Sequence, residues 1–247
     1  MKLSSIINYP LGWLGLHLSR KKNNQPSSSI DIENDQEFMQ LYEKVKPYSL
    51  VELERSYALY QSVLYIIRNQ IPGDFVECGV WKGGSCMLIA LTLLKENSGS
   101  RRIWLYDSFE GMPKPGDQDG PDEKSEWVRK STGTDSSNWC LASEDEVRQN
   151  IYSTGYPVNL FSIIKGKVED TLPGTIPSQI SLLRLDTDWY ASTKHELIHL
   201  YPLLPKGAVL IIDDYGAWQG ARKATDEYFG NTVFLQRIDW TGRMLIK

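Results

Sequence analysis

From residue 74 onward, the hydrophobic and polar positions follow two alternating patterns. Short apolar runs predict strands at 75–79, 102–107, 160–165, 180–186 and 208–213. Apolar residues at helical spacing predict helices at 84–95, 143–154, 193 to about 202, and 219–229. Two further strands are predicted at 232–236 and 243–247. Continuous apolar strands between helices are typical of a parallel sheet covered on both faces, so the pattern predicts an α/β fold.

Two of these helices carry a sequence signal for their first turn. Ser143 followed by Glu146, and Thr193 followed by Glu196, match the capping box. In that motif the hydroxyl of the first residue accepts a hydrogen bond from the backbone N–H three residues later. We therefore expect helices to begin at these two positions.

The N-terminal part of the chain divides into a tail and a helical region. Residues 5–19 are apolar but include Pro10, and they are too short to cross a membrane and lack a following cleavage site. The alternatives for them are a mobile tail, a homo-oligomer contact, and an interfacial or partner-binding segment. The polar run at 21–29 predicts a linker. We expect a tail and linker over 1–35 and one domain over 36–247, which opens with helices in 36–72.

Residues 110–142 interrupt the alternation of strands and helices. They are rich in Gly, Pro, Asp and Ser and contain Trp127 and Trp139. A loop of this length in a compact domain is usually a lid, a binding loop or disordered. Because two tryptophans argue against plain disorder, we expect a lid.

The composition excludes several classes of function. A net charge of −4 gives no reason to expect a nucleic-acid partner, since phosphate binding needs clustered Lys and Arg. Three cysteines without a C-x-x-C pair indicate neither a disulfide framework nor a zinc site, and they suit a reducing cytoplasm. With only three histidines in the chain, any metal site must rest mainly on carboxylates.

The first candidate site lies where the strand at 75–79 ends. Ligands of open α/β sheets bind at the carboxyl ends of the strands. Here the glycine-rich segment ECGVWKGGS (77–85) leads into a helix, but its G-x-x-x-G-G spacing disfavours a nicotinamide cofactor. Asp107, at the end of the next strand, can accept from both hydroxyls of a ribose, and Glu77 can accept from an ammonium group. The alternative is a tight strand-to-helix turn with a capping acid.

Acidic residues also follow the strands at 180–186 and 208–213. Asp186 ends the first of these strands, and Asp213 and Asp214 follow the second. If the two strands are neighbours, the three carboxylates converge and repel one another unless a cation intervenes. Mg²⁺ is the expected cation, because it prefers oxygen ligands. The alternative is that Asp214 only caps the following helix and that Asp188 faces solvent.

Five segments, in this order, carry a resemblance to a known family. PGDFVECGVWKGGS, WLYDSFEGMP, KGKVEDTLP, LLRLDTDWYAST and GAVLIIDDYGAWQGARKATDEYF, over roughly residues 50–230, resemble the macrocin O-methyltransferase family. The resemblance implies a Rossmann-like class I methyltransferase with a mostly parallel seven-stranded sheet. It also implies that the chain uses S-adenosylmethionine and Mg²⁺ to methylate a sugar hydroxyl of a natural product.

The resemblance further implies roles for single residues. The turn with Glu77, Gly79 and Ser85 would hold the methionine part of the cofactor, and Asp107 with Ser108 would hold its ribose. The segment with Gly166, Glu169 and Asp170 would lie near its adenine. Asp186, Asp213 and Asp214 would be the metal ligands, with Asp186 also acting as the general base.

The chain departs from its relatives at two positions. The family usually has Glu after the Tyr of its D-x-D-x-Y motif, where this chain has Ala191, so local substrate contacts are expected to differ. Catechol-type relatives carry a lysine where this chain has Trp189, which disfavours catechol chemistry.

The sequence therefore predicts an S-adenosylmethionine- and Mg²⁺-dependent O-methyltransferase acting on a small-molecule hydroxyl. One alternative is a protein that binds S-adenosylmethionine without catalysis, which the intact set of three acids disfavours. The other is a nucleotide-sugar oxidoreductase, which the glycine spacing disfavours. The only Tyr-x-x-x-Lys after a strand end is Tyr190 to Lys194.

Overall fold

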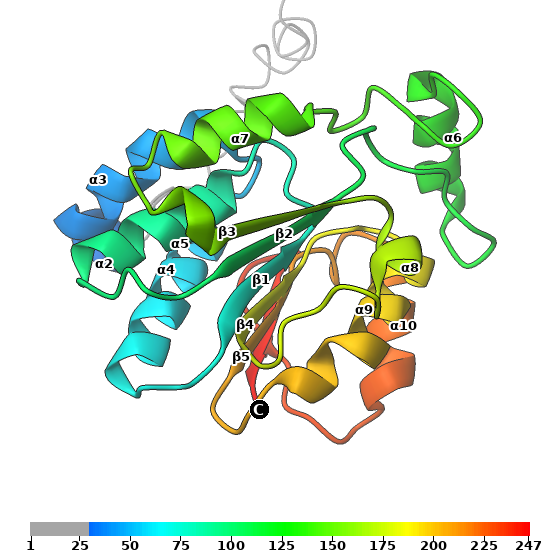
Figure 1. The fold of residues 1–247 in the computed structure, drawn as a ribbon. Coiled ribbons are helices and arrows are strands. Elements are labelled where there is room, and N and C mark those ends of the chain that lie inside the picture. Colours follow the sequence, from blue (N-terminus) through cyan, green and yellow to red (C-terminus); the bar gives the residue numbers. More distant parts are fainter. Residues whose placement is uncertain (1–29) are drawn as a thin grey trace, which may run out of the picture.

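A seven-stranded sheet forms the centre of the computed structural model, which describes residues 30–247 (Figure 1). Its strands are β1 (Asp74–Cys78), β2 (Ile103–Asp107), β3 (Phe161–Lys165), β4 (Ile180–Leu185), β5 (Val209–Ile212), β6 (Gln236–Arg237) and β7 (Arg243–Ile246). They are arranged in the order β3-β2-β1-β4-β5-β7-β6, with β1 to β5 parallel and β7 antiparallel to both of its neighbours. The prediction of an α/β fold with a mostly parallel seven-stranded sheet is confirmed.

Helices cover both faces of the sheet (Figure 1). One layer holds α2 (Ile30–Asn34), α3 (Gln36–Val45), α4 (Leu53–Arg68), α5 (Gly84–Lys95) and α7 (Glu144–Tyr152). The other holds α8 (Val168–Thr171), α9 (Tyr190–His199) and α10 (Gln219–Phe229). Successive strand residues, such as Leu182 and Leu183, belong to opposite hydrophobic cores. Because both faces are buried, the strands read as unbroken apolar runs.

The predicted helix starts have different outcomes. The Ser143 hydroxyl accepts from the backbone N–H of Glu146 at 3.2 Å, so the first capping box is confirmed. The second is wrong, because α9 begins at Tyr190 and Thr193 lies inside the helix. Glu196 is fully buried and accepts from the Thr187 hydroxyl instead of reaching back to a cap.

Two boundaries differ from the sequence predictions. The predicted strand 232–236 is reduced to β6, a two-residue strand at the edge of the sheet. Residues 30–34, expected in the linker, form helix α2, and the Asp35 side chain then accepts from Phe38 N at 3.0 Å and caps α3. The apolar segment 5–19 and the polar run 21–29 lie outside the described residues.

Residues 110–142 contain a helix, α6 (Pro121–Lys130), where the sequence predicted a loop. Pro121 occupies its first turn, followed by two acidic residues, and basic residues stand in its last turn, which is the charge order that stabilises a helix. Trp127 is buried, and its indole N–H donates to the Met112 carbonyl at 2.9 Å. Figure 1 shows α6 beyond the carboxyl ends of the strands, apart from both helical layers.

The strand order fixes where a ligand can bind. β1 pairs with β2 on one side and with β4 on the other, so the order reverses direction along the chain at this pair. In open α/β sheets the crevice at such a reversal, outside the carboxyl ends of the strands, is the usual binding site. Within residues 30–247, no helix combines the length and apolar character that a membrane crossing requires.

Candidate functional site

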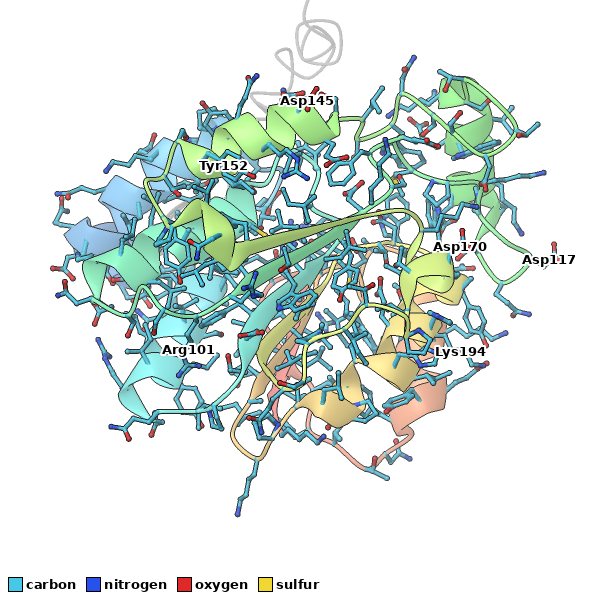
Figure 2. The ribbon with its side chains drawn as sticks, viewed as in Figure 1. Arg101, Asp117, Asp145, Tyr152, Asp170 and Lys194 are labelled. Atoms are coloured by element: carbon cyan, nitrogen blue, oxygen red, sulfur yellow. The ribbon has the colours of Figure 1, made fainter. Side chains whose placement is uncertain are left out.

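A cavity of about 300 Å³ opens at the carboxyl ends of β1, β2, β4 and β5. All of the residues predicted for cofactor or metal binding line it: Glu77, Gly79, Ser85, Asp107, Ser108, Gly166, Glu169, Asp186, Asp213 and Asp214. The residues predicted for the cofactor and those predicted for the metal therefore line the same cavity. Asp170, named with them by resemblance, lies exposed on the outside of α8 (Figure 2).

The glycine turn after β1 is tightly built. Gly79 has φ +78°, and a Cβ at this position would lie 2.0 Å from the carbonyl oxygen of Asp186. No side chain can be accommodated there, so the glycine is required by the close approach of the β1 and β4 ends. Gly83, with φ +88°, precedes the first turn of α5, and Gly84 and Ser85 of that turn line the cavity.

Asp107 holds this turn in place. One of its carboxylate oxygens accepts from the backbone N–H groups of Val80 at 2.8 Å and Trp81 at 3.3 Å, and the other accepts from Phe109 at 2.8 Å. Burial raises the pKa of Asp107, and the three N–H groups oppose that rise. The predicted ribose acid thus also acts as the capping acid of the alternative interpretation. A carboxylate has about four acceptor positions, so one remains for a ligand.

Glu77 is buried under the cavity and is already paired. Its Oε1 lies 2.5 Å from Nη1 of Arg184, and its Oε2 accepts from the Cys86 thiol at 2.8 Å. Burial raises the pKa of Glu77 to about 7, against the opposing charge of Arg184. The same Arg184 nitrogen lies 2.6 Å from Asp186. One buried guanidinium therefore connects the predicted cofactor acid with a predicted metal acid.

Three carboxylates meet at the ends of β4 and β5 without a basic partner for each. Asp186, Asp188 and Asp214 each offer an oxygen, and these oxygens lie within 4.8 Å of one another. Oδ2 of Asp214 is buried without a hydrogen-bond partner among residues 30–247. Burial raises the pKa of Asp188 to about 8 and that of Asp214 well above its ordinary value, and the neighbouring carboxylates add to both shifts.

Asp213, predicted as the third ligand, is not part of this group. Its two oxygens instead accept from Arg184 and from Arg55, and Arg55 Nε also lies 2.9 Å from Asp239. Burial raises the pKa of Asp213 to about 6, and both guanidinium groups oppose the shift. Asp188, expected to face solvent in the alternative interpretation, takes the third place in the cluster. Its backbone has φ +66°, in the left-handed region, three residues after the end of β4.

Aromatic side chains form the wall beside the acids. Trp139, Trp189 and Trp218 pack edge to face, with ring centroids 5.8 to 6.1 Å apart. Trp139 and Trp218 line the cavity. The Trp189 indole N–H donates at 2.9 Å to the carbonyl of Pro113, which also lines the cavity. Residues of the 110–142 segment therefore form part of the cavity wall.

Sequence reasoning missed several residues of this site. Arg184 stands inside the buried apolar run of β4, and a charged residue there is rarely without an ionic partner. That signal was available, although it does not identify the partners. Arg55 carried no comparable signal, because it lies on α4 in a segment whose pattern predicts only a helix.

The Tyr190–Lys194 pair lies outside the site. Lys194 Nζ lies 2.6 Å from the Tyr190 hydroxyl, which bonds to Glu227 of α10 at 2.6 Å. None of these three residues lines the cavity, and Figure 2 shows Lys194 on the outer surface. The pair therefore joins two helices on the surface. Ala191, the departure from the family pattern, is also exposed and does not line the cavity.

Comparison with known proteins gives consistent matches. Residues 17–247 match the family model of macrocin O-methyltransferase (TylF). The chain is 35% identical over 199 residues to the 8-demethyl-8-(2,3-dimethoxy-alpha-L-rhamnosyl)-tetracenomycin-C 4'-O-methyltransferase of Streptomyces olivaceus, covering 79% of this chain and 74% of the relative. It is 31% identical over 181 residues to the mycinamicin III 3''-O-methyltransferase of Micromonospora griseorubida, covering 73% and 70%.

Solved structures show the same fold. The O-methyltransferase NovP superposes with a TM-score of 0.73 at 32% identity, covering 81% of this chain and 82% of that chain. The calicheamicin methyltransferase CalS11 has a TM-score of 0.60 at 20% identity, covering 89% and 93%, and shows likeness of fold alone. With a family model over most of its length and relatives above 30% identity, the chain belongs to the macrocin O-methyltransferase family and is an O-methyltransferase of the class I fold.

Proposed function

We propose that this enzyme transfers the methyl group of S-adenosylmethionine to a sugar hydroxyl of a glycosylated natural product, with Mg²⁺ held by its strand-end acids. One observation carries the proposal. The acid cluster of Asp186, Asp188 and Asp214, which lacks enough basic partners, lines the same cavity as the glycine turn and Asp107. The printed names of two relatives, which concern a rhamnosyl tetracenomycin and mycinamicin III, support the glycoside as substrate class.

Cofactor binding is supported by the wall at β1 and β2. The turn from Gly79 to Ser85 leaves backbone groups open to the cavity, and Asp107 retains acceptor capacity beside Ser108. Across the cavity, Gly166 and Glu169 border the space in which an adenine would fit. Glu77 is committed to Arg184, so we assign it to orienting that arginine as well as to the cofactor ammonium.

The acid cluster fits Mg²⁺ by its donor chemistry. All three side chains offer oxygen, and a buried carboxylate oxygen of Asp214 has no partner within residues 30–247. Mg²⁺ is usually bound by one or two carboxylates and keeps several waters, which a substrate can replace. We assign Asp186 and Asp214 as its ligands. Bound there, the ion would stabilise the negative charge that develops on the substrate oxygen.

Proton uptake needs a further group, for which the sequence predicted Asp186. One oxygen of Asp186 is taken by Arg184, so metal binding and proton uptake would compete for the other. Asp188 lines the same cavity, and its oxygen lies within 4.8 Å of those of Asp186 and Asp214, so we assign proton uptake to Asp188. The tryptophan wall excludes water from this side and holds the sugar ring, and fixing the hydroxyl in line with the methyl group lowers the barrier further.

A titration and an assay test the function together. Calorimetry should show binding of S-adenosylmethionine and no binding of NAD, which removes the oxidoreductase alternative. Methyl transfer to a glycoside, found by comparing metabolites with and without the gene, should then depend on Mg²⁺ and stop in excess chelator while cofactor binding persists. Full transfer in chelator would contradict the metal role. Cofactor binding without transfer to any glycoside would favour the non-catalytic alternative.

Two further expectations concern the cellular compartment and the assembly of the enzyme. Cys78, Cys86 and Cys140 are free thiols, which supports a reducing compartment such as the cytoplasm. Homo-oligomer formation stays a prediction that sedimentation of the purified enzyme can decide.

A further inference from the structure

Helices α9 and α10 begin without caps of their own. Their N-cap residues are Trp189 and Trp218, and neither makes a side-chain hydrogen bond to the helix. The first backbone N–H groups of a helix have no partner within the helix and need an outside acceptor when buried. Both helix starts lie beside the cavity, directly behind the acid-bearing turns after β4 and β5.

The 110–142 segment supplies the missing acceptors. Asp119 Oδ1 accepts from the backbone N–H of Tyr190, the first residue of α9, at 2.8 Å. Glu123 Oε1 accepts from the backbone N–H of Gln219, the first residue of α10, at 3.3 Å. The two acids are only 5% and 4% exposed. Burial raises the pKa of Asp119, and the backbone N–H groups of Tyr190 and Gly116 oppose that rise.

The fit around Asp119 leaves no spare room. Its second oxygen accepts from Gly116 N at 2.7 Å, so one carboxylate joins the 110–142 segment to α9. A Cβ on Gly220 of α10 would lie 1.8 Å from Asp119 Oδ1. Only a residue without a side chain allows Asp119 to enter between the two helices.

We infer that Asp119 and Glu123 are positioning residues that lock the 110–142 segment closed over the cavity. The same helix starts hold the reacting acids: Trp189 directly follows Asp188, and the Trp218 backbone N–H donates to the Asp214 carbonyl at 2.9 Å. Closure of the lid therefore also fixes Asp188 and Asp214. The consequence for methyl transfer rests on the proposed function, whereas the locking of the lid does not.

Another contact of the lid is weaker. Lys167, beside the adenine segment, pairs with Asp135 of the lid, but both side chains are about two-fifths exposed. Exposed ion pairs contribute little and are screened by salt. The buried caps are the contacts that should decide how often the lid opens.

Limited proteolysis of the full chain tests the lock. Trypsin sites inside the segment are Lys124, Arg129 and Lys130, since the bond between Lys114 and Pro115 is not cleaved. Asp119→Ala and Glu123→Ala should each raise the rate of cleavage within 110–142 by a factor of about 5 to 30, as expected for a lost buried cap. The matched control is Asp117→Ala, which removes an exposed acid of the same segment and should stay within about twofold of the unaltered chain. Figure 2 places Asp117 at the outer edge of the segment.

Rescue separates positioning from general damage. Asn keeps one acceptor oxygen, so Asp119→Asn can retain the cap on Tyr190 while it loses the acceptor for Gly116, and it should restore only part of the protection that Asp119→Ala loses. Far-UV circular dichroism confirms that each variant is folded, and in the enzyme assay Asp119→Ala should lower kcat more than it raises KM. Cleavage of Asp119→Ala and Glu123→Ala at the control rate would overturn the lock. A protein that shows the lock but binds no S-adenosylmethionine would instead contradict the proposed function alone.

Discussion

Two groups of carboxylates share one edge of the sheet and differ in what surrounds them. Glu77 and Asp213 are buried and Asp107 is half-buried, but arginines or backbone N–H groups face their oxygens. Asp188 and Asp214 are crowded by other acids, and Oδ2 of Asp214 has no partner within residues 30–247. The pKa values follow this difference, at about 6 for Asp213 and about 8 for Asp188. Strand-end acids of the same type are thus divided by their neighbours into acids paired with arginine or backbone N–H groups and acids crowded by other acids.

The largest effect should come from removing a cluster acid. Asp214→Asn should lower kcat at least about a thousandfold, because it removes a metal ligand where charge develops in the transition state. Affinity for S-adenosylmethionine should stay within about threefold, since the cofactor wall is separate. Steady-state kinetics and calorimetry measure the two quantities. Equal losses of both would show that the two groups of acids act as one.

The next effect concerns Asp213, an acid that is paired with two arginines. Asp213→Asn should lower the free energy of unfolding by about 3 kcal/mol, because it leaves Arg55 and Arg184 buried without a full counter-charge. Urea titration measures this, with Glu227→Gln as the control, since its pair with Lys194 is exposed and should matter by less than about 1 kcal/mol. Stabilisation by added Mg²⁺ should persist in Asp213→Asn. If it disappears, Asp213 is a ligand, as the resemblance implied.

Asp107 allows a finer comparison, because backbone N–H groups and not arginines face its oxygens. Asp107→Ala should weaken S-adenosylmethionine binding by roughly 2 kcal/mol, or about 30-fold, because ribose hydroxyls lose a charged acceptor. It should also lower stability, because the turn at Val80 loses its acceptor. Calorimetry and thermal unfolding separate the two effects. Lower stability with unchanged cofactor affinity would leave Asp107 with the structural role alone.

The smallest effect is a pH dependence of the metal-free protein. The folded-state pKa values of Asp188 and Asp214 are raised, so their protonated forms are favoured by folding. Their contribution to stability is present below about pH 4 and is lost as pH rises toward 8. Without metal, the free energy of unfolding should therefore fall as pH rises from 5 to 8.

Two additions sharpen that measurement. Saturating Mg²⁺ should flatten the decline, because it replaces the protons on the cluster. Asp188→Asn should flatten it without metal, because it removes one of the repelling charges. A stability of the metal-free enzyme that is constant or rising over this range would contradict the crowded cluster.

Local patterns were enough to predict the fold class and the edge of the sheet that carries the site. Strand and helix periods depend on neighbouring residues, and parallel strands bring their carboxyl ends to one edge whatever their order. Gly79, Asp107, Asp186 and Asp214 could therefore be chosen from the sequence, and all four line the cavity. The first helical turn of α9 was misplaced, because its cap comes from Asp119, far away in the chain.

Only the tertiary structure decided which acids are paired with arginines. Arg55 reaches Asp213 across 158 positions of the chain, and Arg184 reaches Glu77 across 107. No local pattern reports such pairs, whereas the protonation of a buried carboxylate depends on the few charges within about 4 to 6 Å of it. The sequence therefore determined where the acids gather, and long-range packing determined that Asp213 is held by arginines while Asp188 joins Asp186 and Asp214.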